Sequence, residues 1–177
     1  MSPPRFRYRG LAYRAHHPRW SFAPTSGEGA KRHGGRFNRP GREAFYCSIR
    51  PETAWIEAQQ GFPFKPQPLL LCAYDVDCAD LVDLTDATVR EALGPTLLEL
   101  GCAWEDLADR GRVPPTWALA ERLIADSCAG IRVRSFAPGA RSSDHNLVFW
   151  DWSEAPPRQL RLIDDEARLP RDDRSWR

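Results

Sequence analysis

The sequence lacks long hydrophobic runs. Its longest apolar stretch, around residues 69–73, is far shorter than the roughly 20 residues that a membrane-spanning helix needs. No apolar segment follows residues 1–5, so no targeting segment is expected. The five cysteines are far apart and form no C-x-x-C pair, which argues against a disulfide framework and against a zinc site. These absences favour a cytoplasmic protein with reduced thiols that does not contact a membrane.

Metal-binding patterns are also missing from the sequence. His16, His17 and His33 occur in a basic segment, but no carboxylate or cysteine spacing completes a metal site around them. The aspartates between residues 75 and 86 do not have the spacing of an EF-hand loop. We therefore expect no metal cofactor. Internal repeats and low-complexity domains are absent as well, and a chain of 177 residues fits one domain.

The charges of the chain are distributed unevenly, although its formal net charge is only +1. Residues 1–50 contain eleven Lys or Arg and two Glu, whereas residues 51–100 contain two basic and nine acidic side chains. A concentration of basic side chains implies an anionic partner or contact with the acidic half of the same fold. The candidate partners are a phosphate-bearing small molecule, a nucleic acid and an acidic protein.

An α+β fold is indicated by the order of the expected elements, because strands and helices do not alternate strictly. Hydrophobic periodicity predicts strands over residues 6–14, 44–47, 69–76, 130–136, 146–152 and 159–163, and helices over residues 48–60, 88–101 and 116–127. The first strand is expected at a sheet edge with one basic face. Residues 15–42 are expected to form a long loop, which in a compact domain is typically functional or disordered. The domain is expected over residues 1–163, followed by a charged, loosely ordered tail over residues 164–177.

One candidate site combines the segment Gly34–Asn38 with two residues that follow it. Two glycines before Arg36 allow the backbone to approach a ligand closely, and the planar guanidinium matches phosphate oxygens. Tyr46 ends a predicted strand, and Glu57 is about two turns into the predicted helix that follows. Taken singly, each residue is equally compatible with a turn, a packing contact or a solvated helix face. Together they indicate an anion-binding loop beside a carboxylate.

The spacing of several motifs resembles that of the RES domain family. The resemblance runs from about residue 6 to residue 163, and its most specific part is the pair Gly-Arg-Phe-Asn and Thr-Ala-x-x-Glu. The matching segments are Tyr13-Arg14, Gly35-Arg36-Phe37-Asn38, Tyr46-Cys47-Ser48, Thr53-Ala54-x-x-Glu57, Arg134-Ser135 and Asn146-Leu147-Val148-Phe149.

This resemblance implies a fold and a function. RES proteins are typically toxins of bacterial toxin–antitoxin systems, inhibited by an antitoxin with a helix-turn-helix DNA-binding region. Their fold is similar to that of ADP-ribosyltransferase toxins, which implies a central, mostly antiparallel split β-sheet flanked by helices. They act on NAD⁺, which some members degrade by hydrolysis or phosphorolysis, while others transfer its ADP-ribose to a protein target. The residues of this chain do not indicate which of these acceptors is used.

The resemblance also implies roles for individual residues. Arg14 and Arg36 become the residues that bind NAD⁺, with Asn38 beside them in the same motif, and Tyr46 becomes an aromatic wall near the nicotinamide. Glu57 becomes the catalytic carboxylate, and Arg36 is implied as a second catalytic residue. Ser135 becomes the catalytic serine of the family, although Ser142 and Ser143 are close alternatives in the sequence.

Two other functions remain possible from the residues alone. Aromatic residues such as Phe6, Tyr8 and Tyr13 alternate with arginines, which is typical of a module that stacks bases and follows a phosphate backbone. An interaction protein without enzymatic activity is the third possibility. We favour the NAD⁺-consuming enzyme without direct nucleic-acid binding, because a buried carboxylate has no use in a groove that follows phosphates.

Overall fold

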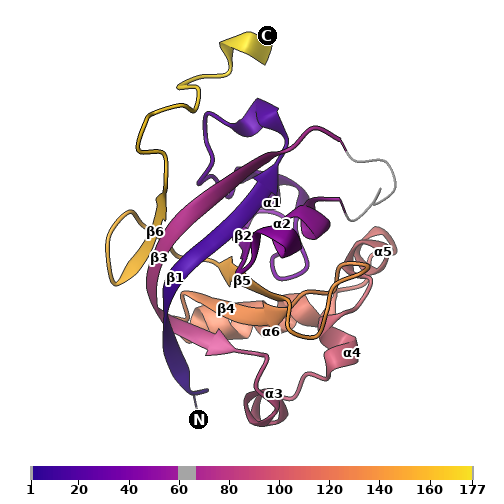
Figure 1. Ribbon diagram of the computed structural model, residues 1–177. Coiled ribbons are helices and arrows are strands. Elements are labelled where there is room, and N and C mark those ends of the chain that lie inside the picture. The colour runs from indigo at the N-terminus through magenta and orange to yellow at the C-terminus, as the bar shows by residue number, and fades with distance from the viewer. Residues whose placement is uncertain (1, 60–66, 177) are drawn as a thin grey trace.

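A six-stranded sheet forms the centre of the computed structural model, which describes residues 2–59 and 67–176 (Figure 1). The strands are β1 (Arg5–His16), β2 (Phe45–Ser48), β3 (Leu70–Asp83), β4 (Gly130–Arg134), β5 (His145–Phe149) and β6 (Arg158–Leu162). Their order is β1-β2-β5-β4-β3-β6, and all pairings are antiparallel except that of β3 with β4. The expected α+β class and the mostly antiparallel sheet are confirmed.

The sheet is a closed ring of five strands and not the split sheet that we expected. An additional pairing of β1 with β3 closes the order β1-β2-β5-β4-β3 on itself, and β6 continues the sheet outside the ring, on β3. Closure depends on the length of β1, because this strand pairs with β3 over nearly its whole length and also reaches β2 at Tyr13 and Ser48. The prediction of an edge strand over residues 6–14 was therefore wrong.

The basic face of β1 is balanced by aspartates of β3. Arg7 donates two hydrogen bonds to Asp77, the Arg9 guanidinium is 3.3 Å from the same carboxylate, and Arg5 is 3.8 Å from Asp80. Arg7 holds the pKa of Asp77 below its ordinary value. Of the two explanations for the uneven charge, contact between the basic and acidic segments therefore accounts for this strand.

Six α-helices and two short 3₁₀ segments are seen in the described part of the chain. The helices are α1 (Glu28–His33), α2 (Pro51–Ala58), α3 (Ala87–Leu93), α4 (Leu97–Leu100), α5 (Trp104–Asp109) and α6 (Pro115–Ala125), and the 3₁₀ segments are Pro18–Trp20 and Arg174–Trp176. In Figure 1, α1 and α2 are close to β2, whereas α3 to α6 gather beside β4. None of these helices is long and apolar enough to cross a bilayer, in the part of the chain that was searched.

Local chemistry explains where several helices begin and end. The single helix expected over residues 88–101 is two helices, because Gly94 has a φ of +96° and ends α3, and Pro95 follows it. Thr96 and Glu99 then form a capping box that starts α4. Pro51 occupies the first turn of α2, as expected, while the exit at Gly61 falls outside the described residues.

Two hydrophobic clusters pack against the two faces of the sheet, one inside the ring and one between the sheet and the helices. The inner cluster includes Phe45, Tyr74 and Phe149, all fully buried. The outer cluster lies between the opposite faces of β4 and β5 and the helices, and includes Val148 and Leu123. Because side chains alternate along a strand, every second residue of β2 and β5 faces this outer side. Tyr46 and Ser48 on β2 and Asn146 on β5 follow this alternation.

Candidate functional site

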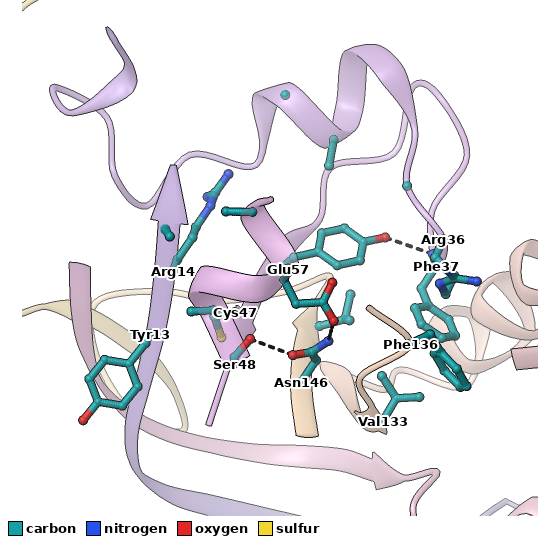
Figure 2. A pocket seen from close by; sticks show the side chains of 18 of the residues that line it. Tyr13, Arg14, Arg36, Phe37, Cys47, Ser48, Glu57, Val133, Phe136 and Asn146 are labelled. Atoms are coloured by element: carbon teal, nitrogen blue, oxygen red, sulfur yellow. Dashed lines mark hydrogen bonds between the residues drawn. The ribbon is translucent and has the colours of Figure 1, made fainter. Parts of the chain in front are cut away.

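A cavity of about 380 Å³ is lined by β1, α1 and the loop after it, α2, and the strands β2, β4 and β5. This volume is in the range of small-molecule binding sites. Of the residues that the sequence nominated, Arg14, Arg36, Tyr46 and Glu57 line it. Figure 2 shows Arg14 and Arg36 on opposite sides, with Glu57 between them in the view. Residues that are up to 43 positions apart in the chain are thus brought to one cavity by β1, the loop and α2.

The Glu57 carboxylate is held by two neutral donors. Ser135 Oγ donates a hydrogen bond of 2.6 Å to Glu57 Oε1, and Asn146 Nδ2 donates one of 2.5 Å to the same oxygen. Ser135 directly follows β4, Asn146 is on β5, and Glu57 is on the last turn of α2. Three separate elements therefore fix the orientation of one carboxylate at the cavity.

The geometry distinguishes between the three candidate serines. Ser135 is buried behind the cavity lining and contacts Glu57, whereas Ser142 and Ser143 are exposed. A second bond stabilises the position of Ser135, because its N–H donates to the Asp144 carbonyl over 2.7 Å. Of these serines, Ser135 is the one in position to act with Glu57.

The segment Gly35–Asn38 is a tight hairpin that projects Arg36 towards the cavity. Gly35 and Asn38 exchange backbone hydrogen bonds of 2.9 and 3.3 Å. Two tryptophan indoles fasten its carbonyls, since Trp117 Nε1 donates to Gly35 over 2.8 Å and Trp150 Nε1 donates to Phe37 over 2.9 Å. The predicted long loop is thus an ordered structure that contains a helix and this hairpin.

Asn38 supports the hairpin from inside and does not line the cavity. It is only 2% exposed, and its Nδ2 donates to the carbonyls of Ala30 and Arg42 over 2.8 and 2.9 Å. Its Oδ1 accepts a 2.7 Å bond from the Tyr46 hydroxyl. Asn38, for which the sequence predicted a role in ligand binding, thus has its side-chain polar atoms engaged by the protein itself and holds the hairpin together.

Tyr46 presents its ring to the cavity while its hydroxyl is fixed. The hydroxyl accepts a bond of 2.9 Å from the Phe37 N–H and donates to Asn38. Burial raises the pKa of Tyr46 well above its ordinary value, so that the side chain is neutral. A fixed, neutral ring is suited to packing against a flat aromatic ligand.

Gly35 is a position where any side chain would disturb this arrangement. A Cβ atom there would lie 2.6 Å from both Asn38 Oδ1 and the Tyr46 hydroxyl. We expect Gly35→Ala to lower the free energy of unfolding by about 1–3 kcal/mol, the usual cost of overpacking. Thermal unfolding measures this effect. Gly29→Ala is the matched control, because a Cβ there meets nothing within 4 Å and alanine favours a helix, so its unfolding temperature should rise. Equal effects of the two variants would contradict this account.

Arg36 and Arg14 have no carboxylate partner among residues 2–59 and 67–176. Arg36 donates to the carbonyls of Leu100 and Cys102 at the end of α4 and packs over the Phe136 ring at 5.3 Å. Arg14 donates to the Ser26 carbonyl over 2.9 Å and lies 4.7 Å from the centre of the Phe45 ring. Their contacts are with neutral carbonyls and rings, so both guanidinium groups can still pair with an anionic ligand.

The burial of Arg14 strengthens this interpretation. Loss of water lowers the pKa of Arg14 below its ordinary value, and its neighbours Tyr74 and Cys47, whose own pKa values are raised by burial, oppose this lowering only in part. A cation among neutral groups in a poorly solvated place attracts an anion more strongly than one in water.

Sequence reasoning did not assign roles to Asn146 and Ser48, although both are in the quoted motifs. Ser48 Oγ donates to Asn146 Oδ1 over 2.7 Å, which links β2 to the amide that contacts Glu57 (Figure 2). The signal that could have found them is the two-residue period of the strands. Asn146 shares a face of β5 with Val148, and Ser48 shares a face of β2 with Tyr46.

Metal chemistry has no support in the described part of the chain. No group of three or more His, Cys, Asp or Glu side chains is arranged there to hold an ion. The charged side chains that line the cavity are instead Glu57, Arg14, Arg36 and Arg134, and Tyr46 is among its aromatic residues.

These features define a small α+β domain whose cavity suits an anionic, partly aromatic ligand next to a fixed carboxylate. The chain belongs to the RES domain family, whose model matches residues 11–172. No curated protein sequence matches it.

Among the solved structures with a similar fold is a chain of the crystal structure of the M. tuberculosis MbcT–MbcA toxin–antitoxin complex, with a TM-score of 0.59 and 22% sequence identity. The alignment covers 90% of this chain and 84% of that chain. At this identity the likeness shows the fold, and the fold alone.

Proposed function

We propose that this protein is an NAD⁺-cleaving toxin of a bacterial toxin–antitoxin system that breaks the bond between nicotinamide and ribose. The observation that carries the proposal is the Glu57 carboxylate, fixed by Ser135 and Asn146 at a cavity that Arg14 and Arg36 also line, neither of which pairs with a carboxylate among residues 2–59 and 67–176. Membership of the RES family and the fold shared with a chain of a toxin–antitoxin complex agree with it.

NAD⁺ matches the chemistry of the cavity. Its diphosphate is negatively charged and can pair with the guanidinium groups of Arg14 and Arg36. The planar guanidinium fork bonds well to phosphate oxygens. Its nicotinamide is a flat ring that can pack against Tyr46. Binding energy from the diphosphate, which is remote from the breaking bond, then holds the ribose in a reactive geometry.

Glu57 acts on the charge that develops during cleavage. As the C1′–N bond breaks, its electron pair leaves with nicotinamide and the ribose becomes an oxocarbenium ion, as in glycoside cleavage. A carboxylate oriented beforehand stabilises this positive charge without reorganising during the step. Because nicotinamide leaves as a neutral molecule, no general acid is needed, and one carboxylate suffices.

The acceptor that attacks C1′ decides the overall reaction. Water or phosphate gives NAD⁺ degradation, and a side chain of a protein target gives ADP-ribosylation; in each case the acceptor forms the new bond and loses a proton. Mass spectrometry of the products, with and without cell lysate, distinguishes the three. ADP-ribose alone indicates water, ADP-ribose 1″-phosphate indicates phosphate, and a protein with added ADP-ribose mass indicates transfer.

In cells the proposal predicts growth arrest and loss of NAD⁺. Induced expression of the wild-type chain should stop growth and lower the NAD⁺ pool, and an antitoxin with a helix-turn-helix region should prevent both effects when produced together with it. Normal growth with an unchanged NAD⁺ pool, at a confirmed protein level, would instead favour an interaction protein without activity.

A further inference from the structure

A hydrogen-bonded chain of side chains links the sheet to the carboxylate of the site. Ser48 Oγ donates to Asn146 Oδ1 over 2.7 Å, and Asn146 Nδ2 donates to Glu57 Oε1 over 2.5 Å (Figure 2). Ser48 and Asn146 are directly opposite each other in the antiparallel pairing of β2 with β5. Their relative position is therefore fixed by the backbone of the sheet.

The orientation of the Asn146 amide follows from its two hydrogen-bond partners. An amide has an accepting oxygen at one end and a donating nitrogen at the other. If the amide were rotated by 180°, its oxygen would face the Glu57 carboxylate, and two acceptors would meet without a proton between them. The carboxylate therefore selects the observed orientation, in which the Ser48 hydroxyl, able to donate or to accept, donates to the amide oxygen. Ser48 is 2% exposed, so water does not readily replace it.

We propose that Asn146 is a positioning residue for Glu57 and that Ser48 anchors its amide to the sheet. This inference rests on the proposed function, because positioning matters only if Glu57 acts on a substrate. Together with Ser135, Asn146 holds Oε1 at one point, so that the carboxylate cannot rotate without losing two hydrogen bonds. Both donors are neutral and fix the carboxylate without cancelling the charge that it directs at the ribose.

A double-mutant cycle tests whether Ser48 acts on Glu57 through Asn146. We expect Asn146→Ala to lower kcat for nicotinamide release on the order of tenfold with little change in KM, because misplacing a reacting group affects the chemical step. Ser48→Ala should lower kcat less. In the Asn146→Ala background, Ser48→Ala should have no further effect, because the residue through which it acts is gone. Independent, additive losses would overturn the proposal, as would an Asn146→Ala variant with full kcat.

The matched control is Ser143→Ala, which removes an exposed serine hydroxyl and should leave kcat unchanged. Unfolding temperatures of all variants separate positioning from stability. A loss of kcat that follows the loss of unfolding temperature across the series, the control included, would assign Asn146 a structural role instead.

A second readout does not depend on activity. NMR of the Asn146 side-chain amide in the whole protein should show protons that exchange slowly with water. The exchange should be faster in Glu57→Ala and in Ser48→Ala. If the wild-type protein releases no nicotinamide, the proposed function fails while this measurement still tests the hydrogen-bonded chain. Equal exchange in the three proteins would overturn the positioning role even for an active enzyme.

Discussion

Glu57→Gln is expected to lower the rate of nicotinamide release by roughly two to three orders of magnitude, the range found when an electrostatic stabiliser is removed. Glutamine has nearly the shape of glutamate, and its side-chain oxygen can still accept bonds from Ser135 and Asn146. The variant therefore removes the negative charge and retains the arrangement around it. Nicotinamide release by purified protein with NAD⁺ measures the effect.

The control for this prediction is Glu52→Gln on the same helix. Glu52 is exposed and pairs with Arg50 at 3.5 Å, outside the cavity lining. The same chemical change there should leave the rate unchanged, and both variants should unfold near the wild-type temperature. A Glu57→Gln protein with the full rate would show that the carboxylate does not stabilise the transition state.

Arg36→Met is expected to raise KM for NAD⁺ by about 10- to 100-fold, since a hydrogen bond to a charged group contributes about 1.5–3 kcal/mol. Methionine retains the contact with the Phe136 ring and removes the guanidinium that would bind the diphosphate. Because the diphosphate is distant from the breaking bond, the effect should fall mainly on binding. Titration calorimetry with ADP-ribose gives the same loss of affinity without turnover.

Arg39→Met is the matched control on the same loop. The Arg39 guanidinium donates to Glu121 on α6 and is absent from the cavity lining, so its removal should leave KM near the wild-type value. Equal KM values for Arg36→Met and the wild type would exclude the phosphate-binding role of Arg36.

Much of the fold could be predicted from local patterns. The strand over residues 44–47 and the helix beginning at Pro51 depend on alternation and on proline at the first turn, which act within a few residues. The closed ring could not be predicted in the same way. It requires β1 to contact β3 and β2, which are distant in the sequence. The extension of β3 to Asp83 was missed because its aspartates resemble a turn, whereas arginines of β1 and β4 pair with them.

The sequence nominated part of the site, including the neutral residues Tyr46 and Ser135. Arg36 and Glu57 are noticed because charge next to glycine or on a helix is distinctive, whereas Arg14 is indicated only by the resemblance to the RES family, and the structure brings all three to one cavity. Asn38 faces the protein backbone, which a sequence does not show. Asn146 was overlooked, since its importance depends on a partner 89 residues away.

The uneven charge also had two explanations that only the structure could separate. Along β1 the arginines face aspartates of β3, which removes part of the support for a nucleic-acid-binding surface. Arg14 and Arg36, which have no carboxylate partner among residues 2–59 and 67–176, are instead at the cavity. The basic segment therefore contains arginines that pair with β3, namely Arg5, Arg7 and Arg9. It also contains two candidates for ligand binding, Arg14 and Arg36.

The central claim is that the Glu57 cavity cleaves NAD⁺ between nicotinamide and ribose. The most direct measurement is chromatography of NAD⁺ incubated with purified wild-type protein, with nicotinamide quantified over time. The account predicts that nicotinamide appears in step with the loss of NAD⁺, whichever acceptor receives the ADP-ribose. NAD⁺ that remains intact with folded protein, in the presence of phosphate and of cell lysate alike, would contradict it.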